Sequence, residues 1–284
     1  MKFKERIDQF VILKKAETRP ATMKYYSAKL GMIERYLGDV EDTDINELVI
    51  ADFTNKQKKR NPKISPRTLN YYRQIIVRII KDTTGRKIKI KRLNETRPFI
   101  KSVDEANIYK IIKYFSSNIE QYENHKYLLI IKLLTETGVR LTELVNIEVK
   151  NINISFRAIQ LDRTKTGASR VVFFSEDTKM ILYSYLEKLK HKSKYLLTAQ
   201  DYKRPMNPVT VYRALIRLQE RLGIEQSISP HKFRHYFAKK FIKKGGDLSS
   251  LQTILGHTEL STTEMYLRFN IDELKENYDE IMKD

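Results

Sequence analysis

The apolar residues of the first 85 positions recur every three or four places, which is the spacing of an amphipathic helix. Two such stripes predict two helices, and a shorter third helix is expected after Asp44. A fourth helix has clear ends, with Ser65 at its N-cap, Pro66 at its first position and Gly85 just beyond its last turn. The first two stripes are formed by Phe3, Ile7, Phe10, Val11 and Leu13 and by Tyr26, Leu30, Ile33 and Leu37, and the stripe of the fourth helix is formed by Leu69, Tyr72, Ile76, Ile79 and Ile80. We therefore predict a helical domain over residues 1–85.

Residues 86–99, RKIKIKRLNETRPF, interrupt the helical pattern. The segment is basic, lacks helical periodicity and contains a proline, which disfavours a helical conformation in the residue before it. We predict that it is the linker between two domains. Its alternation of apolar and basic residues leaves a short strand as the alternative.

The remaining residues predict a second domain of mixed structure over residues 100–284. Ser102 and Glu105 have the spacing of a capping box, and an apolar helix around residues 127–134 ends at Gly138, with a short helix after Arg140. The pattern then alternates over residues 158–162 and 170–174, which predicts two strands joined by a turn. After these strands we predict only helices, with caps at Ser175, Asn207, Asp247, Ser261 and Asn270. The expected fold class is mainly α with a small β-sheet.

The charge of the chain indicates the kind of partner that it binds. The chain has 54 Lys and Arg against 35 Asp and Glu, a formal net charge of +19. Such a basic protein is attracted to polyanions, most often nucleic acid, although a surface that is merely solvated is the alternative. Residues 1–100 hold 24 basic and 12 acidic side chains, whereas the last 34 residues hold 3 and 8. This segregation favours DNA as the partner of the first domain.

Composition also excludes several classes of site. The chain has no cysteine, which excludes disulfides and thiolate metal sites, and its five histidines lack paired metal-ligand spacing. We expect no metal and no cofactor. No run of about 18 apolar residues is present, so we expect no membrane segment and a cytoplasmic location.

Four segments of the second domain carry residues suited to attack on a phosphodiester. They are TGVRLTEL with Arg140, RTKTG with Lys165, SPHKFRH with His231 and Arg234, and LGHTELSTTEMY with His257 and Tyr266. Such an attack builds negative charge on the phosphate oxygens, which preorganised arginines stabilise. A phenol with a pKa of about 10 needs a base and nearby cations to attack at neutral pH. Taken singly, each of these residues is more often an ordinary surface or packing residue, so the hypothesis rests on the set.

Spacing suggests individual roles. His231 and Arg234 lie three apart on a helix that starts at Pro230, so they share a face near an N-terminus that attracts anions. His231 is suited to accept the phenol proton, whereas His235 is expected only to pack or to cap. Lys165, on the turn between the strands, is placed to reach into a groove and to donate a proton to a leaving sugar oxygen.

In this order the four segments resemble the motifs of the tyrosine recombinase (integrase) family, and Glu143 falls where that family commonly has a glutamate. The resemblance implies a helical, SAM-like core-binding domain and a mixed α/β catalytic domain that together clamp DNA. It also implies a covalent 3′-phosphotyrosine intermediate that forms without metal or ATP. Matched by position, the phosphate-binding arginines are Arg140 and Arg234, the general acid is Lys165, the acid/base is His231, the phosphate hydrogen-bond donor is His257 and the nucleophile is Tyr266.

The resulting hypothesis is a site-specific DNA recombinase, either Xer-like or the integrase of a mobile element. Only about 100 residues precede the predicted catalytic domain, which leaves room for a core-binding domain alone. Two alternatives remain open. One is a nicking and closing enzyme similar to type IB topoisomerases, and the other is a DNA-binding protein without activity.

The expected partner is double-stranded DNA, bound by a homo-tetramer whose chains are monomers when free. The polar face of the fourth helix is suited to enter a groove of DNA, although an ordinary solvated face has the same pattern; its residues are Arg67, Asn70, Tyr71, Gln74 and Arg78. After Tyr266 the apolar residues of the last segment again have helical spacing. The family implies that this helix passes to a neighbouring subunit, and packing within its own chain is the alternative.

Overall fold

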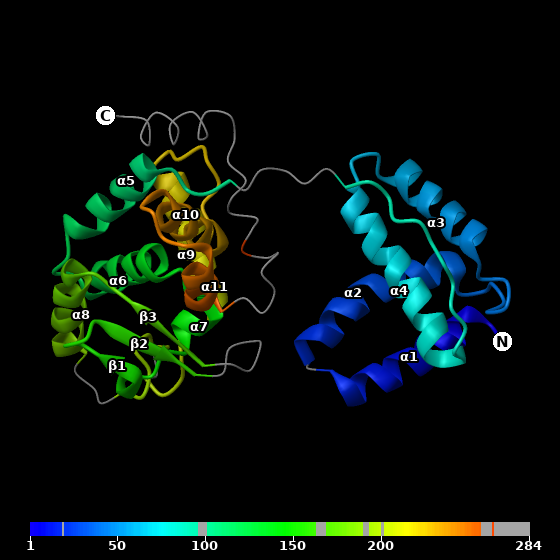
Figure 1. The fold of residues 1–284 in the computed structure, drawn as a ribbon, viewed down its shortest axis with the longest axis horizontal. Coiled ribbons are helices and arrows are strands. Elements are labelled where there is room, and N and C mark those ends of the chain that lie inside the picture. Colours follow the sequence, from blue (N-terminus) through cyan, green and yellow to red (C-terminus); the bar gives the residue numbers. More distant parts are fainter. Residues whose placement is uncertain are drawn as a thin grey trace. The chain divides into compact units, whose positions relative to one another are not determined.

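The chain folds into two compact units, Met1–Arg97 and Pro98–Asp284 (Figure 1). The structure is a computed structural model that describes residues 1–18, 20–95, 101–162, 169–189, 193–199, 202–256 and 263. The boundary between the units falls near the end of the segment predicted as a linker.

The described residues of the first unit form four helices, α1 (Phe3–Glu17), α2 (Pro20–Leu37), α3 (Glu47–Arg60) and α4 (Pro66–Thr84). The predicted ends of α4 are confirmed, because Ser65 Oγ accepts the Thr68 amide at 3.1 Å and Gly85 has a φ of 74°. The apolar stripes of the helices meet in one core, whose wholly buried members include Phe3, Phe10, Ile33, Ile76 and Ile79.

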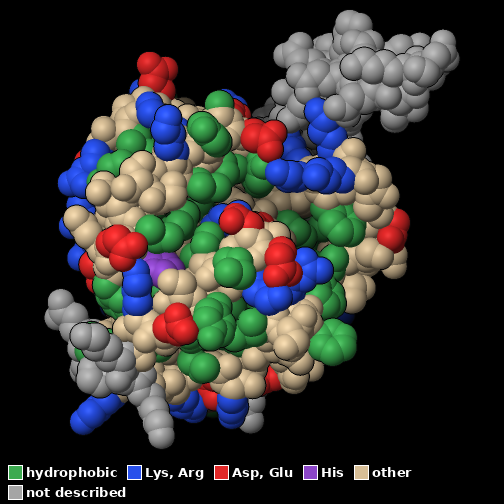
Figure 2. Space-filling view, turned by 90° about the vertical axis from the view of Figure 1, so that its left-hand side faces the viewer, with side chains coloured by type: hydrophobic (Ala, Val, Ile, Leu, Met, Phe, Trp, Pro, Cys, Tyr) green, Lys and Arg blue, Asp and Glu red, His purple; other side chains and the backbone are tan. Residues whose placement is uncertain are grey.

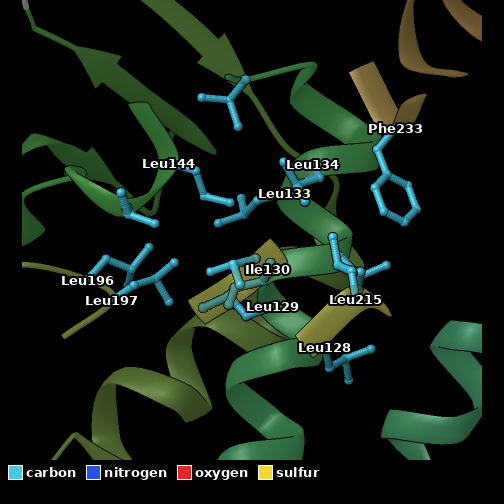
Figure 3. Close-up of a cluster of buried hydrophobic side chains, with 14 of the residues drawn as sticks. Leu128, Leu129, Ile130, Leu133, Leu134, Leu144, Leu196, Leu197, Leu215 and Phe233 are labelled. Carbon is cyan, nitrogen blue, oxygen red and sulfur yellow. The ribbon is translucent and has the colours of Figure 1, made fainter. Parts of the chain in front are cut away.

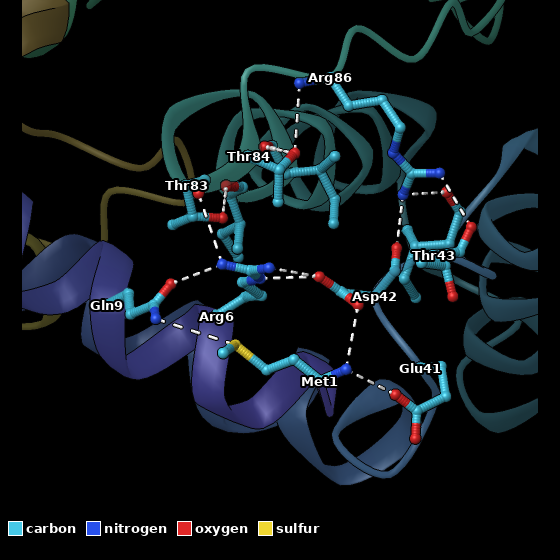
Figure 4. Close-up of polar contacts among 12 residues, drawn as sticks. Met1, Arg6, Gln9, Glu41, Asp42, Thr43, Thr83, Thr84 and Arg86 are labelled. Atoms are coloured by element: carbon cyan, nitrogen blue, oxygen red, sulfur yellow. Dashed lines mark hydrogen bonds and ion pairs between the residues drawn. The ribbon is translucent and has the colours of Figure 1, made fainter.

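The loop between α2 and α3 is fixed by arginines from both ends of this unit. Arg6 donates from Nε to Asp42 at 2.8 Å, and the amino group of Met1 donates to Glu41 at 2.8 Å (Figure 4). From the other end of the unit, Arg86 donates to backbone carbonyl groups of the same loop. The loop therefore joins the start of α1 to the segment that follows α4.

Residues 86–95, which we call the strap, have no regular structure and lie against the helices of the first unit. Ile88 and Ile90 pack on the core of this unit. Further along, the side chain of Asn70 accepts the Leu93 amide and donates to the Leu93 carbonyl, both at 2.9 Å. The strand alternative is wrong for residues 86–95, where a side chain supplies the hydrogen bonds that a neighbouring strand would otherwise supply.

The described helices and strands of the second unit begin with α5 (Glu105–Ser116), α6 (Tyr122–Thr137), α7 (Leu141–Val145), η1 (Val149–Asn151), β1 (Ile152–Asn153), β2 (Ala158–Leu161) and β3 (Arg170–Phe173). They continue with α8 (Glu176–Lys188), α9 (Pro208–Arg221), α10 (Pro230–Lys243) and α11 (Leu248–Leu255). The three strands form an antiparallel sheet in the order β1-β2-β3. Both predicted strands are confirmed, whereas β1 was missed because its two residues are too short to show alternation.

Helix α6 is the centre of the second unit. Its residues Leu129, Ile130, Leu133 and Leu134 are wholly buried, because α5, α8 and α10 all contact this helix (Figure 3). A helix buried on several sides is apolar around much of its circumference. The long apolar run at residues 127–134 therefore marks a central helix.

Two sequence predictions for the second unit are wrong. Helix α5 starts at Glu105 with Asp104 as its N-cap, not at Ser102, because the side chain of Gln226 bonds the Ser102 carbonyl and the Asp104 amide and holds this stretch outside the helix. Residues 193–199 and 202–206 are not helical, because Tyr195 pairs with Glu148 in a β-bridge. The predicted caps at Ser175, Asn207 and Asp247 are confirmed, and those at Ser261 and Asn270 lie outside the described residues.

Within the described ranges, no helix combines the length and the apolar character needed to cross a membrane.

The contact between Asn70 and the strap gives a first prediction. Replacing Asn70 with alanine leaves the Leu93 amide without its acceptor, so we expect that amide to exchange its hydrogen about tenfold faster. Hydrogen exchange followed by NMR measures this rate. Gln74→Ala, at an exposed position of the same helix, is the matched control. An unchanged rate at Leu93 in Asn70→Ala would show that the hydrogen bond does not hold the strap.

Candidate active site

The first arginine of the predicted site lies at a sharp turn between α6 and α7. Gly138 has a φ of 60°, and a Cβ there would lie 2.4 Å from the ring of Phe237, so a glycine is needed for this turn. Arg140 follows as the N-cap of α7. Its backbone amide donates to Glu143 at 2.8 Å and its Nη1 donates to the same carboxylate at 2.9 Å. Glu143 therefore orients both the backbone and the side chain of Arg140.

The same carboxylate also binds a second arginine, Arg170, at the start of β3. The two terminal nitrogens of Arg170 donate to the two oxygens of Glu143 at 2.9 and 2.7 Å, and both side chains are at least nine-tenths buried. Burial acts to raise the pKa of Glu143, but the hydrogen bonds and charge of Arg170 and the hydrogen bonds of Arg140 lower it to about 2. Glu143 is thus ionised at neutral pH.

Arg170 was missed by the sequence analysis. The signal was present, because alternation places Arg170 on the same face of its strand as Val172 and Phe174, and both of these are buried. A charged residue on an apolar strand face requires a buried partner. The position of that partner, Glu143, is not visible in a local pattern.

Arg234, the other predicted arginine, lies on α10 and is only 4% exposed. Its terminal nitrogens donate to the carbonyl oxygens of Gly138 and Leu255, each at 2.7 Å. Arg140 and Arg234 are therefore brought together around the Gly138 turn and the end of α11.

Three guanidinium groups bind three successive carbonyl oxygens at the end of α11. Arg170 Nε donates to Ile254 at 2.7 Å, Arg234 donates to Leu255, and Arg140 Nη2 lies 3.4 Å from the oxygen of Gly256. The last carbonyls of a helix have no partner within the helix and carry partial negative charge, so cations stabilise them. The three bonds fix the backbone immediately before His257.

His231 lies in the first turn of α10, as predicted from Pro230. Burial lowers its pKa, and the positive charges of Arg234 and Arg140 lower it further. The ring is therefore neutral at neutral pH, which is the form that accepts a proton. His235 is more buried, and desolvation together with the nearby His231 and Arg234 lowers its pKa to about 4.

Lys165, His257 and Tyr266 lie outside the described residues. Two of the three are flanked by elements that the structure describes: Lys165 falls between the paired strands β2 and β3, and His257 follows the end of α11.

The predicted DNA-binding face lies on α4 of the first unit. Arg67, Tyr71, Gln74 and Arg78 are exposed and follow one another at intervals of four, three and four residues, so they form a single stripe. Arg78 is paired with Asp82 by two hydrogen bonds of 2.7 and 2.8 Å. Asn70, by contrast, is 3% exposed and its amide is used by the strap.

The face of the second unit that is turned towards the viewer in Figure 2 has no uniform charge. Figure 2 shows exposed hydrophobic side chains there, interspersed with both basic and acidic ones. A surface that follows a DNA backbone is instead dominated by basic groups. This face is therefore poorly suited to contact DNA.

The Glu143 carboxylate gives a second prediction. In Glu143→Gln the two arginines lose their counter-charge, so we expect a loss of about 3 kcal/mol in the free energy of unfolding at pH 7. The folded pKa is about 2 and the ordinary value is 4.5, so the stabilising effect of the carboxylate is complete above pH 4.5 and decreases as the pH falls towards 2. Denaturant unfolding at several pH values checks this, with exposed Glu225→Gln as the control. A deficit that does not shrink below pH 4.5 contradicts the assignment.

The histidines give a third prediction. In an NMR titration we expect His235 to titrate near pH 4 and His231 below 6.5. Arg140→Met should raise the pKa of His231, because one of the charges that lowers it is removed. Arg213→Met, which removes an exposed arginine of α9, is the control and should leave it unchanged. A His231 pKa at or above 6.5 in the wild type disproves the electrostatic coupling.

Comparison with known proteins covers most of the chain. The model of the phage integrase family matches residues 101–273. The chain is 29% identical over 266 residues to tyrosine recombinase XerA of Saccharolobus solfataricus, covering 90% of this chain and 85% of that protein. It is 27% identical over 274 residues to a tyrosine recombinase of Pseudothermotoga lettingae, covering 90% of each.

Solved structures share the fold. The crystal structure of XerA recombinase aligns over 99% of both chains with 22% identity and a TM-score of 0.58. A structure of the Tn1549 transposon integrase in complex with a circular intermediate DNA aligns over 99% of both chains, with 16% identity and a TM-score of 0.78. A lambda integrase dimer bound to a core site covers 94% of this chain and 96% of that one, with 19% identity and a TM-score of 0.72. The predicted fold class is confirmed.

The matched residues 101–273 are more than half of the chain and include all four motif segments. The chain therefore belongs to the phage integrase family and is a tyrosine recombinase, an enzyme of DNA strand transfer.

Proposed function

We propose that this tyrosine recombinase cleaves and rejoins DNA at specific sites through a covalent 3′-phosphotyrosine intermediate, with Tyr266 as the nucleophile. The observation that carries the proposal is the set of three arginines bound to the end of α11. That contact places the positive charges at the point in the sequence from which the chain continues to His257 and Tyr266.

Arg140 and Arg234 are the proposed phosphate ligands. The side chain of Arg140 remains 22% exposed, so it is accessible to a DNA phosphate, whereas Arg234 is buried beneath the same turn. Removing one such preorganised donor typically costs about 3–4 kcal/mol of transition-state stabilisation. Arg170 has a different role, because its donors are bonded to Glu143 and Ile254 and it holds the other groups in position.

The proposed chemistry is a direct transesterification. The phenolic oxygen of Tyr266 forms a bond to phosphorus and the bond to the 5′ oxygen of the deoxyribose breaks. Neutral His231 accepts the phenol proton, and Lys165 donates a proton to the leaving oxygen. His257 donates a hydrogen bond to the phosphate. The energy of the phosphodiester is conserved in the tyrosyl bond, so the reverse reaction rejoins a strand without ATP.

The domain roles form part of the same proposal. Residues 1–85 act as the core-binding domain, the segment 86–99 as the linker and residues 100–284 as the catalytic domain. The exposed stripe of α4 contacts DNA, and Tyr25 of α2 extends it, since its ring lies 6.3 Å from that of Tyr71. Asn70 contributes indirectly by holding the strap.

The proposed assembly is a homo-tetramer on two DNA sites, formed from chains that are monomers when free in the cytoplasm. Strand exchange between two duplexes requires four cleavage sites, and the lambda integrase relative is a dimer on one core site. The helix that the sequence predicts after Tyr266 is proposed to pass to the neighbouring subunit.

The fourth prediction tests the nucleophile. After selection of a binding site from random-sequence DNA, a nicked suicide duplex of that site is incubated with the protein in EDTA. We expect a covalent protein–DNA band with the wild type and at least a 100-fold loss in Tyr266→Phe, because the phenolic oxygen is the attacking atom. Tyr212→Phe, at an exposed tyrosine of α9, should retain the band. A band that persists in Tyr266→Phe removes that residue from its role.

A plasmid assay separates recombination from the topoisomerase alternative. With two copies of the selected site, a recombinase yields deletion or inversion products. A nicking and closing enzyme relaxes a plasmid that has one site and yields no exchange products with two. Relaxation without exchange would refute the recombinase proposal, and a missing adduct would favour a DNA-binding protein without activity.

A further inference from the structure

The first unit contains a basic recess that none of the predicted site residues accounts for. It lies between α3, α4 and the strap and has a volume of about 440 Å³. Four cationic side chains and no carboxylate line it: Lys58 from α3, Arg73 from α4, and Lys91 and Arg92 from the strap. In Figure 1 the strap runs between α3 and α4, so three separate segments of the chain supply the positive charge.

Arg73 is the unusual member of this group. It is only 6% exposed, its Nε is buried without a hydrogen-bond partner, and no carboxylate among the described residues forms an ion pair with it. Burying a charge without a partner costs free energy, and proteins normally offset that cost with a counter-charge. Arg234, the comparable buried arginine of the second unit, bonds two carbonyl oxygens. The structure of the first unit thus leaves Arg73 without a counter-charge of its own.

We propose that the recess binds a phosphate of the DNA backbone and that Arg73 is its central ligand. A guanidinium group presents paired N–H donors that match a phosphate, and the flanking ammonium groups add charge without demanding a particular geometry. The inference rests on the proposed function only for the identity of the anion, which is the DNA that the enzyme acts on.

The recess lies on a different side of α4 from the exposed stripe. Arg73 and Gln74 are adjacent in sequence, so their side chains leave the helix about 100° apart. With the stripe facing the bases, the recess would therefore lie over the sugar-phosphate backbone at the edge of the same groove. Phosphate contacts of this kind set the register of a protein on DNA, while other side chains read the bases.

The bound phosphate would also fix the strap. Lys91 and Arg92 belong to the strap, and the neighbouring Leu93 is bonded to Asn70 on α4. Arg92 is paired with Glu95 of the strap at 3.0 Å, so Lys91 is the strap residue whose charge is available to the anion. An anion held by Arg73, Lys58 and Lys91 therefore joins the strap to both helices. DNA binding by the first unit would then determine where the chain leaves that unit towards the catalytic unit.

The test compares Arg73→Met with Lys56→Met. Both variants remove one positive charge from the first unit, but Lys56 is an exposed residue of α3, paired with Asp52, and does not line the recess. We expect Arg73→Met to weaken binding to the selected duplex about tenfold and to reduce the slope of log affinity against log salt by about 0.9. Lys56→Met should change the affinity less than twofold. The Tm of Arg73→Met should equal or exceed that of the wild type, because the variant removes an unpaired buried charge.

Two further measurements keep the result decisive. Should Arg73→Met fail to fold, Lys91→Met, at an exposed position of the strap, makes the same comparison of affinity and salt slope. Thermal unfolding in inorganic phosphate distinguishes a free anion from DNA. A phosphate-dependent rise in Tm that Arg73→Met abolishes, together with unchanged DNA affinity, overturns the DNA assignment in favour of a small anion. Equal affinities for Arg73→Met and Lys56→Met without any phosphate effect refute the recess as a site.

The result of this binding test is independent of the result of the test for the covalent adduct. A wild-type protein that binds the duplex but forms no covalent adduct refutes the strand-transfer mechanism. In that case, a comparison of the DNA affinities of the wild type and Arg73→Met still tests whether the recess binds a phosphate.

Discussion

A single buried carboxylate holds the candidate active site together. Glu143 binds Arg140 and Arg170, and without it two guanidinium groups would lie close together with no counter-charge. Three arginines and one carboxylate still leave an excess of positive charge. The carbonyl oxygens at the end of α11 carry only partial negative charge, so they reduce this excess without removing it. The site is therefore stable enough to pack in the free protein and remains electrostatically suited to an anion.

The same contacts explain how distant parts of the second unit act together. Arg170 and Ile254 are 84 residues apart, and Arg234 and Gly138 are 96 apart, yet each pair is joined by a bond of 2.7 Å. A change in the position of Arg170 at the start of β3 therefore alters the contacts at the end of α11. In this arrangement the sheet contributes to the site through Arg170 at the start of β3.

Features of the fold that are decided by residues close together in the sequence could be predicted, whereas those decided by distant residues could not. The caps at Ser65 and Asn207 and the end of α6 at Gly138 were predicted correctly, because a cap or a glycine turn is decided within about four residues. The start of α5 was misplaced because Gln226, more than 120 residues away, bonds its first residues. The motif residues could be predicted because chemistry restricts the residue types that can act on a phosphodiester, and the structure brings Arg140 and Arg234 together around the Gly138 turn and the end of α11. Arg170 supports them from the start of a strand, and a pattern read locally cannot show that its partner is Glu143.

Two buried arginines, one in each unit, show that the contacts of a buried charge, and not its burial, decide whether the charge stabilises the fold. Arg234 is 4% exposed and Arg73 is 6% exposed, so burial does not distinguish them. Arg234 has carbonyl partners from the turn and the helix that it joins, so its charge contributes to the fold even before a ligand arrives. Arg73 has three cationic neighbours in its recess and no carboxylate there, so its charge weakens the free unit. The same side chain thus stabilises one unit by itself, whereas in the other it becomes favourable only when an anion is bound.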